Sequence, residues 1–403
     1  MNLTEPQAGS DVGALTTRAE RAGDGTYRIT GQKIFITWGD SDVTENVCHL
    51  VLARLPDGAP GTRGISLFMV PKFIPDENGR PGVPNDLRVV SLEHKLGIHG
   101  SPTCVMSFEG AKGWLVGQEH KGMAAMFTMM NCARLGVGIQ GVAQAEAALQ
   151  QAVAYAAERN QMGPIIRHPD VRRMLAEARA EVFAARAICL GCAVAIDMAR
   201  ATGSADWAAR AAFLTPIAKA YGTDVGIRVA DMGVQVHGGM GYIEETGAAQ
   251  YLRDVRITAI YEGTNGIQAM DLVGRKLADG GAAATALLDE ILDGAKAAQS
   301  TQPDLAHEVW QAAETLREAT LDLLELAPED RFAGAVPYLM AFARVLGAHY
   351  HLRAAVEGGP ATLARVHVNR ILPQFCADLA AVRAGGADLG ALDDALLAGQ
   401  MAG

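Results

Sequence analysis

Three long segments rich in alanine, leucine and methionine constrain the fold of this chain most. They run over Met123–Glu158, Pro169–Ala201 and Asp206–Val236, and these residue types favour helices. The pair Gly163-Pro164 ends the first helix before the second begins. We therefore expect a helical bundle in the middle of the chain.

The first 118 residues have a different pattern, which is typical of strands. Tyr27–Thr37 alternates β-branched and aromatic residues with polar ones, and an Asp-Gly turn signal precedes it. Further strands are predicted over Val47–Leu55, Ile65–Val70 and Leu87–Phe108, with loops rich in glycine and proline between them. No helix of normal length is expected before residue 119.

A third section follows the glycine- and alanine-rich stretch 279–284, which is a candidate boundary. Apolar residues spaced by three and four between Leu305 and Leu326 predict a helical seam, and the helices are expected to end near Arg383. The chain has no repeat of fixed period. The predicted order is thus a β-domain, a helical bundle and a second helical domain, which makes an α+β chain.

Charge and composition narrow the function classes. The chain has 403 residues, of which 35 are Lys or Arg and 45 are Asp or Glu, so its formal net charge is -10. Without a basic run, nucleic acid and anionic membrane surfaces are unlikely as primary partners. No apolar run approaches the roughly 18 residues of a membrane span, and the first residues carry no targeting pattern. We expect a soluble, cytoplasmic protein.

The six cysteines suit a reducing compartment, because they are spread over a long chain. Cys189 and Cys192 have the CxxC spacing of redox and metal sites. They also continue an apolar seam that starts at Val171 and Leu175, so we interpret them as core residues. No second CxxC or histidine pair completes a zinc site, and we predict no metal.

The stretch Gly136–Gly141 fits the GxGxxG pattern of dinucleotide-binding domains. That pattern has meaning only between a strand and a helix, whereas the residues before Gly136 are themselves helical. We interpret these glycines as a small-residue stripe at a helix crossing.

Three short segments are candidates for chemistry. In Ile260–Gln268, Glu262 stands between a tyrosine and a glycine; an apolar setting would raise its pKa and make it a useful base, but a solvated loop glutamate has the same sequence. The glycines of Gln235–Tyr242 would let the backbone approach a diphosphate, or would only stop a helix. Thr4–Asp11 offers hydroxyls and backbone amides in a polar loop.

Taken in order along the chain, these segments and four others resemble the acyl-CoA dehydrogenase family of flavoproteins over roughly residues 1–277. The seven segments are Leu3-Thr4-Glu5-Pro6 with Ala8–Asp11, Lys33–Thr37, Lys95–Ser101 leading to Phe108, Asn131–Arg134, Glu158-Arg159 with Gly163, Gln235 with Gly238-Gly239 and Gly241, and Ile260–Thr264.

The resemblance implies a fold and a reaction. The fold would be a β-barrel-like or sandwich domain over 1–118, a four-helix bundle over 119–278 and an additional helical domain over 279–403. Glu262 would be the catalytic base that removes the α-proton of an acyl-CoA thioester, while a hydride passes to FAD. The product would be a trans-2-enoyl-CoA, and electrons would pass to an electron-transfer flavoprotein.

The resemblance also implies binding residues. Those for FAD are Leu3, Thr4, Phe35, Ile36, Thr37, Arg159, Gln161, Gln235, Gly238, Gly239, Thr264 and Gly266. Those for the acyl-CoA are Ser10, Asn131, Arg134, Arg210 and Gly263. Because some of the FAD residues match segments that reach the cofactor of a neighbouring subunit, a homodimer or homotetramer is expected.

Some positions depart from the common family pattern. Gly266 stands where many members have glutamine, Phe35 where tryptophan is common, and Met162 where phenylalanine is usual. These departures suit a bacterial subgroup with an extra C-terminal helical domain, which includes enzymes similar to 3-(methylthio)propanoyl-CoA dehydrogenase. A fatty acyl-CoA is the other substrate that we expect.

The family places a helical domain before the Thr-Glu-Pro motif, whereas this sequence begins at Met1 within it. Either an internal methionine has been taken as the start, or the chain is truncated. The sequence therefore leaves two alternatives to a dehydrogenase: a non-catalytic flavin-binding or assembly subunit, and an acyl-CoA oxidase.

Overall fold

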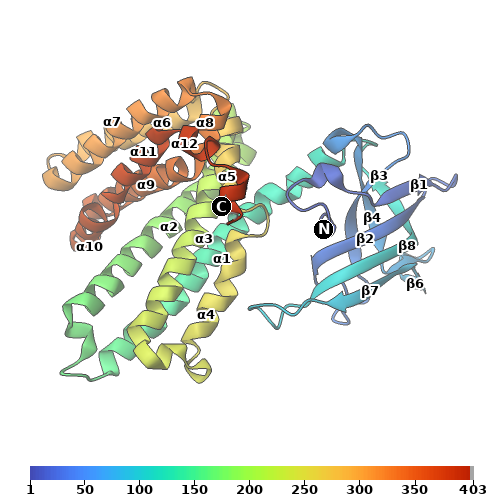
Figure 1. Cartoon of the computed structure of the whole chain (residues 1–403), viewed down its shortest axis with the longest axis horizontal. Helices are drawn as coiled ribbons and strands as arrows, with labels where there is room; N and C mark the ends of the chain where they lie inside the picture. The colour runs from blue at the N-terminus through green and yellow to red at the C-terminus, as the bar shows by residue number, and fades with distance from the viewer. Residues whose placement is uncertain (400–403) are drawn as a thin grey trace. The chain divides into compact units, whose positions relative to one another are not determined.

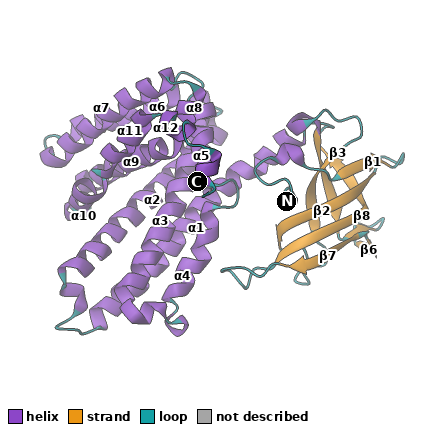
Figure 2. Ribbon diagram, viewed as in Figure 1, coloured by secondary structure: helices purple, strands orange, loops and turns teal. Residues whose placement is uncertain are grey.

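The computed structural model describes residues 1–399, which form two compact units. The first unit is Met1–Cys132 and the second begins at Ala133, so the division falls inside helix α1 (Gly122–Glu158). In the described residues the strands all belong to the first unit, and the second unit is helical (Figure 1, Figure 2).

The first unit is a small barrel. Its strands are β1 (Arg18–Arg21), β2 (Tyr27–Thr37), β3 (Cys48–Arg54), β4 (Ile65–Pro71), β5 (Phe73–Pro75), β6 (Pro81–Pro84), β7 (Leu87–Leu92) and β8 (Thr103–Val116). The main sheet has the order β2-β1-β3-β4-β8-β7, and β8 also pairs with β2, which closes the sheet on itself. Only the β1–β3 pair in this sheet is parallel.

Closure of this sheet confirms the predicted barrel-like domain. The interior is filled by alternating side chains such as Ile29, Val51, Phe68 and Met106, none of which is exposed. The predicted strand Tyr27–Thr37 has the bounds that the structure gives to β2. The hairpin β5–β6 was not predicted, because three prolines and two glycines in Phe73–Pro84 are typical of a loop.

The second unit contains the rest of α1 and the helices that follow it. They are α2 (Pro169–Thr202), α3 (Ala205–His237), α4 (Ala248–Val255), α5 (Asn265–Asp271), α6 (Ala282–Ala298), α7 (Pro303–Glu325), α8 (Pro328–Ala333), α9 (Ala335–Val356), α10 (Ala361–Val366), α11 (Gln374–Ala384), α12 (Ala387–Gly390) and α13 (Asp394–Leu397). The three long helices predicted from composition agree with α1, α2 and α3 to within one residue at each end.

The predicted boundary after residue 278 is not a break in the packing. One hydrophobic core joins Ile188 of α2 and Leu214 of α3 with Leu287 of α6, Leu316 of α7 and Phe342 of α9. The helices after residue 278 therefore pack in the same compact unit as α2 and α3, and a separate third domain stays a prediction. The reason is that α9 lies directly against α2 and α3 (Figure 1).

A stripe of glycines lets α1 and α3 approach closely. A Cβ built on Gly138 would lie 2.6 Å from the carbonyl oxygen of Ala218, and one on Gly222 would lie 2.7 Å from that of Gly138. Gly141 and Gly226 face each other in the same way one turn further. The interpretation of the GxGxxG pattern as a helix crossing is confirmed.

Cys189 and Cys192 lie in the shared core, as predicted. Both thiols are buried; Cys189 donates a weak hydrogen bond to the Ala218 carbonyl, and Cys192 Sγ lies 3.6 Å from Thr215 Oγ1. Burial raises the pKa of Cys189 to about 12 and that of Cys192 to about 11. Such thiols are protonated at neutral pH and are poor nucleophiles and metal ligands.

Helix α2 is long and apolar enough to cross a membrane by length and composition, which the search for apolar runs did not predict. In the structure its buried side chains belong to the shared core of the second unit, and a soluble core helix passes the same test.

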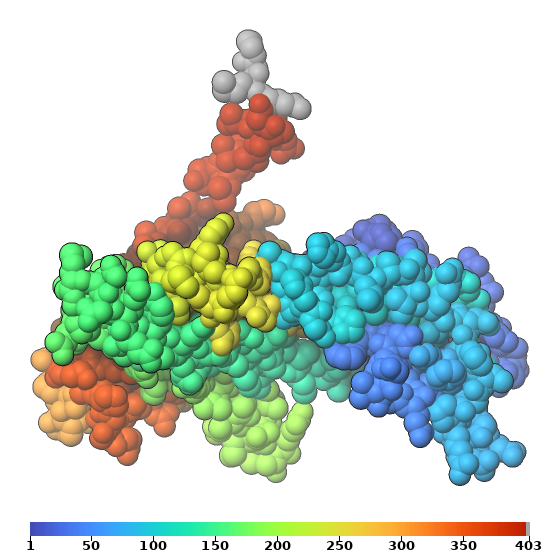
Figure 3. Space-filling model, turned by 90° about the horizontal axis from the view of Figure 1, so that it is seen from below, coloured from blue at the N-terminus to red at the C-terminus, as the bar shows by residue number. Residues whose placement is uncertain are grey.

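The end of the described chain packs differently. Helices α12 and α13 contain no buried residue, although the helices were expected to end near Arg383. Figure 3 shows this red segment standing away from the other helices of the second unit.

Candidate functional site

Glu262 lies in a tight turn that leads into α5. Its φ is +57° and that of Gly263 is +84°, so two consecutive residues are left-handed. A left-handed backbone is unusual for glutamate and costs energy, and such strain is often found at functional sites. The turn ends at Thr264, whose hydroxyl caps α5 by accepting from the Ile267 N–H at 3.2 Å.

Two side chains hold this turn in place. The Tyr261 hydroxyl donates to Gln140 Oε1 on α1, and Gln268 Nε2 lies 3.5 Å from the Glu262 carbonyl oxygen. A Cβ on Gly263 would lie 2.6 Å from Gln268 Nε2, so the turn requires glycine there for space as well as for φ. The carboxylate is thus attached to a fixed backbone.

The Glu262 carboxylate is half-buried between cationic residues. Burial raises its pKa above the ordinary value, while the charges of Arg134 and Lys219 act in the opposite direction. Arg134 on α1 is 6% exposed and pairs with Asp271 at 3.3 Å. This combination gives a carboxylate that accepts a proton more readily than a solvated one but remains near positive charge.

Lys219 was not predicted as a site residue. It is fully buried in α3, where burial lowers its pKa to about 8, and its Nζ donates to Asn265 Oδ1 at 2.8 Å. A lysine inside the apolar run Phe213–Tyr221 was the available signal in the sequence. Its relation to Glu262 depends on packing across more than forty residues of chain and could not be read from that signal.

In the first unit, two of the predicted flavin-lining segments are adjacent. The Ile34 N–H donates to the Thr4 carbonyl at 2.9 Å, and Lys33 Nζ donates to the Leu3 carbonyl at 2.9 Å. A β-bulge between Lys33 and Ile36 sets β2 out of register with β8 and places Phe35 at φ +60°. Phe35 is 61% exposed, so its ring is available to a ligand.

Of the other predicted residues in this unit, Thr37 is exposed and Ile36 is buried in the barrel. Ser10 is exposed in the loop after Glu5, and Asn131 is exposed on α1.

Comparisons with known proteins agree with these two features, the fixed glutamate of the second unit and the exposed aromatic residue at the β2 bulge of the first. Residues 1–111 match the family model described as acyl-CoA dehydrogenase, middle domain, and residues 120–277 match that described as acyl-CoA dehydrogenase, C-terminal domain. The chain belongs to the acyl-CoA dehydrogenase family.

Individual relatives support this assignment. The 3-methylmercaptopropionyl-CoA dehydrogenase of Ruegeria pomeroyi is 47% identical over 365 residues, which are 84% of this chain and 61% of that protein. The butyryl-CoA dehydrogenase structure from Megasphaera elsdenii is 34% identical, with a TM-score of 0.59 over 68% of this chain and 67% of that one. This chain thus spans about three-fifths of the length of the Ruegeria relative.

A third comparison concerns the fold alone. Caenorhabditis elegans ACDH-11, solved in complex with C11-CoA, matches 94% of this chain and 63% of that one at 23% identity, with a TM-score of 0.81. Because this match covers 94% of the chain, the likeness in fold extends to helices beyond residue 277.

Five further predicted FAD residues of this chain lie at one end of the second unit. A small core of residues from α1, α2, α3 and the loop after α1 joins these segments. The exposed residues there are Arg159, Gln161, Gln235, Gly238 and Gly239. Gly238 ends α3 with φ +61°, which a glycine adopts without strain.

The structure does not bring that group to Glu262. Asn265, at the Glu262 turn, contacts Thr223 on α3, and Gln235 lies twelve residues further along that helix. At 1.5 Å per residue this is about 18 Å. Gly263, Thr264 and Gly266, by contrast, belong to the Glu262 turn and the first turn of α5.

Arg210 occupies a different environment from the one expected. It forms an ion pair with Glu290 of α6 and stacks over Trp207, with 5.6 Å from its guanidinium carbon to the ring centre. It also lies nine residues, or about two and a half turns, before Lys219 on α3. Its role toward acyl-CoA stays a prediction, and such a contact would compete with Glu290.

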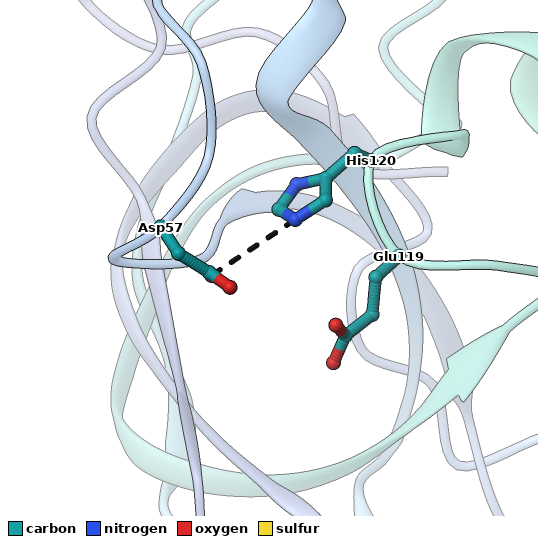
Figure 4. A group of neighbouring side chains, drawn as sticks. All are labelled: Asp57, Glu119 and His120. Carbon is teal, nitrogen blue, oxygen red and sulfur yellow. Dashed lines mark ion pairs between the residues drawn. The ribbon is translucent and has the colours of Figure 1, made fainter.

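One cluster resembles a metal site in composition. Ligand atoms of Asp57, Glu119 and His120 lie within 4.8 Å of one another in the first unit (Figure 4). Arg21 Nη2, however, pairs with Asp57 at 3.1 Å and with Glu119 at 2.6 Å. Because the Arg21 guanidinium already forms ion pairs with both carboxylates, we interpret the cluster as a surface ion-pair network.

Proposed function

We propose that this chain carries the catalytic base and FAD-binding surfaces of an enzyme that dehydrogenates an acyl-CoA thioester to a trans-2-enoyl-CoA. The observation that carries the proposal is the fixed, half-buried Glu262, whose left-handed turn is attached to α1 and α5 beside Arg134. Family membership and the name of the Ruegeria relative support the reaction class.

The chemistry requires a base and an electron acceptor. Glu262 takes the α-proton of the thioester, and the β-carbon loses a hydride, so the substrate is oxidised by two electrons and gains a double bond. Bound FAD supplies the two-electron acceptor. Burial moves the pKa of Glu262 toward neutral pH, and a general base is most effective when its pKa lies near the working pH. Exclusion of water would strengthen the stabilisation of the developing enolate oxygen.

The residues present fit FAD in two places. The exposed Phe35 ring at the β2 bulge, with the Thr4 backbone beside it, suits one face of the isoalloxazine ring. Arg159, Gln161 and the Gln235–Gly239 segment suit a diphosphate and adenosine, since they combine a cation, amides and accessible backbone. Binding of these residues to the FAD of a second subunit is part of the proposal and rests on the family resemblance.

Substrate, partners and location follow as parts of the same proposal. We propose an acyl-CoA substrate, with 3-(methylthio)propanoyl-CoA first because of the Ruegeria relative and a fatty acyl-CoA as the alternative. An electron-transfer flavoprotein would reoxidise the flavin, and the enzyme would be a homodimer or homotetramer. The spread of six cysteines over a long chain supports a reducing, cytoplasmic location.

The test compares Glu262→Gln with Glu318→Gln, which changes an exposed glutamate of α7. Both should bind FAD and appear yellow. The flavin absorbance should bleach on anaerobic addition of acyl-CoA in Glu318→Gln and in the wild type, but not in Glu262→Gln. Bleaching of Glu262→Gln at the wild-type rate would refute the assignment.

The same preparation separates the alternatives. A yellow wild-type chain that no acyl-CoA bleaches would indicate a non-catalytic flavin-binding subunit. Rapid turnover with oxygen and no other acceptor would indicate an oxidase.

A further inference from the structure

The start of α5 is attached to α3 by one side chain, that of Asn265. Its Oδ1 accepts from Lys219 Nζ at 2.8 Å, and its Nδ2 donates to Asp224 Oδ1 at 2.7 Å and lies 3.0 Å from Thr223 Oγ1. A further contact reaches the Ala220 carbonyl at 3.3 Å. One amide therefore connects the first residue of α5 to four residues of α3.

This attachment lies three residues from Glu262. Only Gly263 and the cap residue Thr264 separate Glu262 from Asn265, and the Glu262 backbone is left-handed. A strained turn persists only when its surroundings hold it. Lys219 and Asn265 are placed to do this, because both are anchored to the long helix α3.

We propose that Lys219 and Asn265 are positioning residues of the dehydrogenation reaction: their hydrogen bond fixes the start of α5 and thereby orients the turn that carries Glu262. This inference rests on the proposed role of Glu262 as base. It assigns to a fully buried lysine and to the asparagine of the Tyr-Glu-Gly-Thr-Asn segment roles that the predicted site did not include.

The lysine contributes charge as well as a hydrogen bond. Lys219 favours the carboxylate form of Glu262, as does Arg134 from α1, and both oppose the effect of burial. A lysine with a pKa of about 8 is largely protonated at pH 7, so this charge is present when Glu262 titrates. The two functions of Lys219 can therefore be separated by experiment.

Other charged groups surround this network and remain in every variant. On the helices packed against the turn they are Arg134 of α1, Asp224 of α3, Arg256 before the turn, and Asp271 with Arg275 after it. Arg134 and Arg275 both pair with Asp271, so that group of three has one net positive charge. Loss of the Lys219 charge is thus a single, defined change.

The test uses two substitutions of the lysine. Lys219→Gln keeps a hydrogen-bond donor and removes the charge, whereas Lys219→Met removes both. Asn265→Ala removes the partner and keeps the charge, and it serves if the buried lysine variants do not fold. Lys296→Met is the matched control, since Lys296 is exposed on α6.

The first measurement is the pH at which the Glu262 side-chain carboxyl is half protonated. NMR on the full chain with ¹³C-labelled glutamate monitors this titration. The resonance is identified by its absence in Glu262→Gln. The midpoint should rise by about 0.5–1 pH unit in Lys219→Gln and in Lys219→Met, because an opposite charge nearby favours the carboxylate. It should not move in Lys296→Met.

The second measurement is the anaerobic rate of flavin bleaching by a saturating acyl-CoA as a function of pH. We expect Lys219→Gln to approach the wild-type rate once the pH exceeds its higher midpoint. Lys219→Met and Asn265→Ala should remain slower by ~10- to 100-fold at every pH, since a small misplacement of a base has an effect of that size.

The outcomes distinguish this inference from the proposed function. If the wild type shows no bleaching while the Glu262 midpoint still depends on Lys219, the reaction assignment fails and the electrostatic contact stands. If bleaching requires Glu262 but the wild-type rate persists in Lys219→Met and in Asn265→Ala, the positioning role is wrong and the reaction assignment is unaffected.

Discussion

The ion pair between Glu5 and Lys33 gives the sharpest stability prediction for the first unit. Lys33 Nζ lies 2.8 Å from Glu5 Oε1, and neither side chain is more than 1% exposed. The carboxylate also accepts from Gln7 and from the backbone and hydroxyls of Thr16 and Thr17. Replacing Lys33 by methionine leaves a buried charge with hydrogen bonds but without its counter-ion.

Burial alone would raise the pKa of Glu5. The charge and hydrogen bond of Lys33, together with the hydrogen bonds from Thr17 and Thr16, outweigh burial and lower the pKa to about 2. The unfolded value is 4.5. The unfolded chain thus binds more protons in this range, so the stabilisation is present above pH 4.5 and is lost as the pH falls to 2.

We expect Lys33→Met to lower the free energy of unfolding of the first unit by about 3 kcal/mol at pH 7, at the lower end of the range for a broken buried pair. The low end is expected because five hydrogen bonds to Glu5 remain. The difference from wild type should shrink as the pH falls, since a protonated Glu5 no longer needs a cation. The double variant Glu5→Gln, Lys33→Met should recover part of the loss.

Urea unfolding followed by tryptophan fluorescence measures this, provided that the signal comes from the first unit. Trp207 and Trp310 belong to the second unit, so both are replaced by phenylalanine, which leaves Trp38 and Trp114 as probes. A loss below about 1 kcal/mol at pH 7, or one that grows on acidification, would refute the reasoning, because exposed pairs have that smaller value.

Three further predictions concern the second unit and the thiols. Gly222→Ala should destabilise the second unit by about 1–3 kcal/mol in urea unfolding, since its Cβ would lie 2.7 Å from the Gly138 carbonyl oxygen, whereas Gly136→Ala, where no atom lies within 4 Å, should not destabilise it. Burial lowers the pKa of His367 from 6.5 to about 3, so the unfolded chain gains a proton below pH 6.5 while the folded protein keeps this side chain neutral. The free energy of unfolding should therefore fall by about 2 kcal/mol between pH 7 and pH 5. His367→Gln should remove this contribution, so its thermal midpoint should fall less on acidification. A thiol reagent at pH 7 should react quickly with the three exposed cysteines and with the three buried ones only after unfolding; rapid reaction of all six would contradict the packing.

Much of the fold follows from local patterns. The limits of α1, α2 and α3 agree with the sequence to within a residue, because helix formation depends on residues three and four apart and on glycine and proline at the ends. The same local logic identified Cys189 and Cys192 as core residues. Glu262 was found through a motif, since nine residues contain both the carboxylate and the glycine that its turn requires.

Local sequence patterns did not predict which side chains contact each other. The sequence suggested Arg210 for the substrate, whereas the structure pairs it with Glu290, eighty residues later. It gave no reason to connect Lys219 with Asn265 or to place α9 in the same core as α2. These contacts join residues that only packing brings together.

The sequence by itself therefore determined the three long helices, the strands β2, β3 and β4, the family and Glu262 as the candidate base. Tertiary structure decided which charges surround that base and which helices share its core. The physical reason is range: backbone conformation is selected by near neighbours, while the burial that raises the pKa of Glu262, and the Lys219 and Arg134 charges that oppose it, come from α3 and α1.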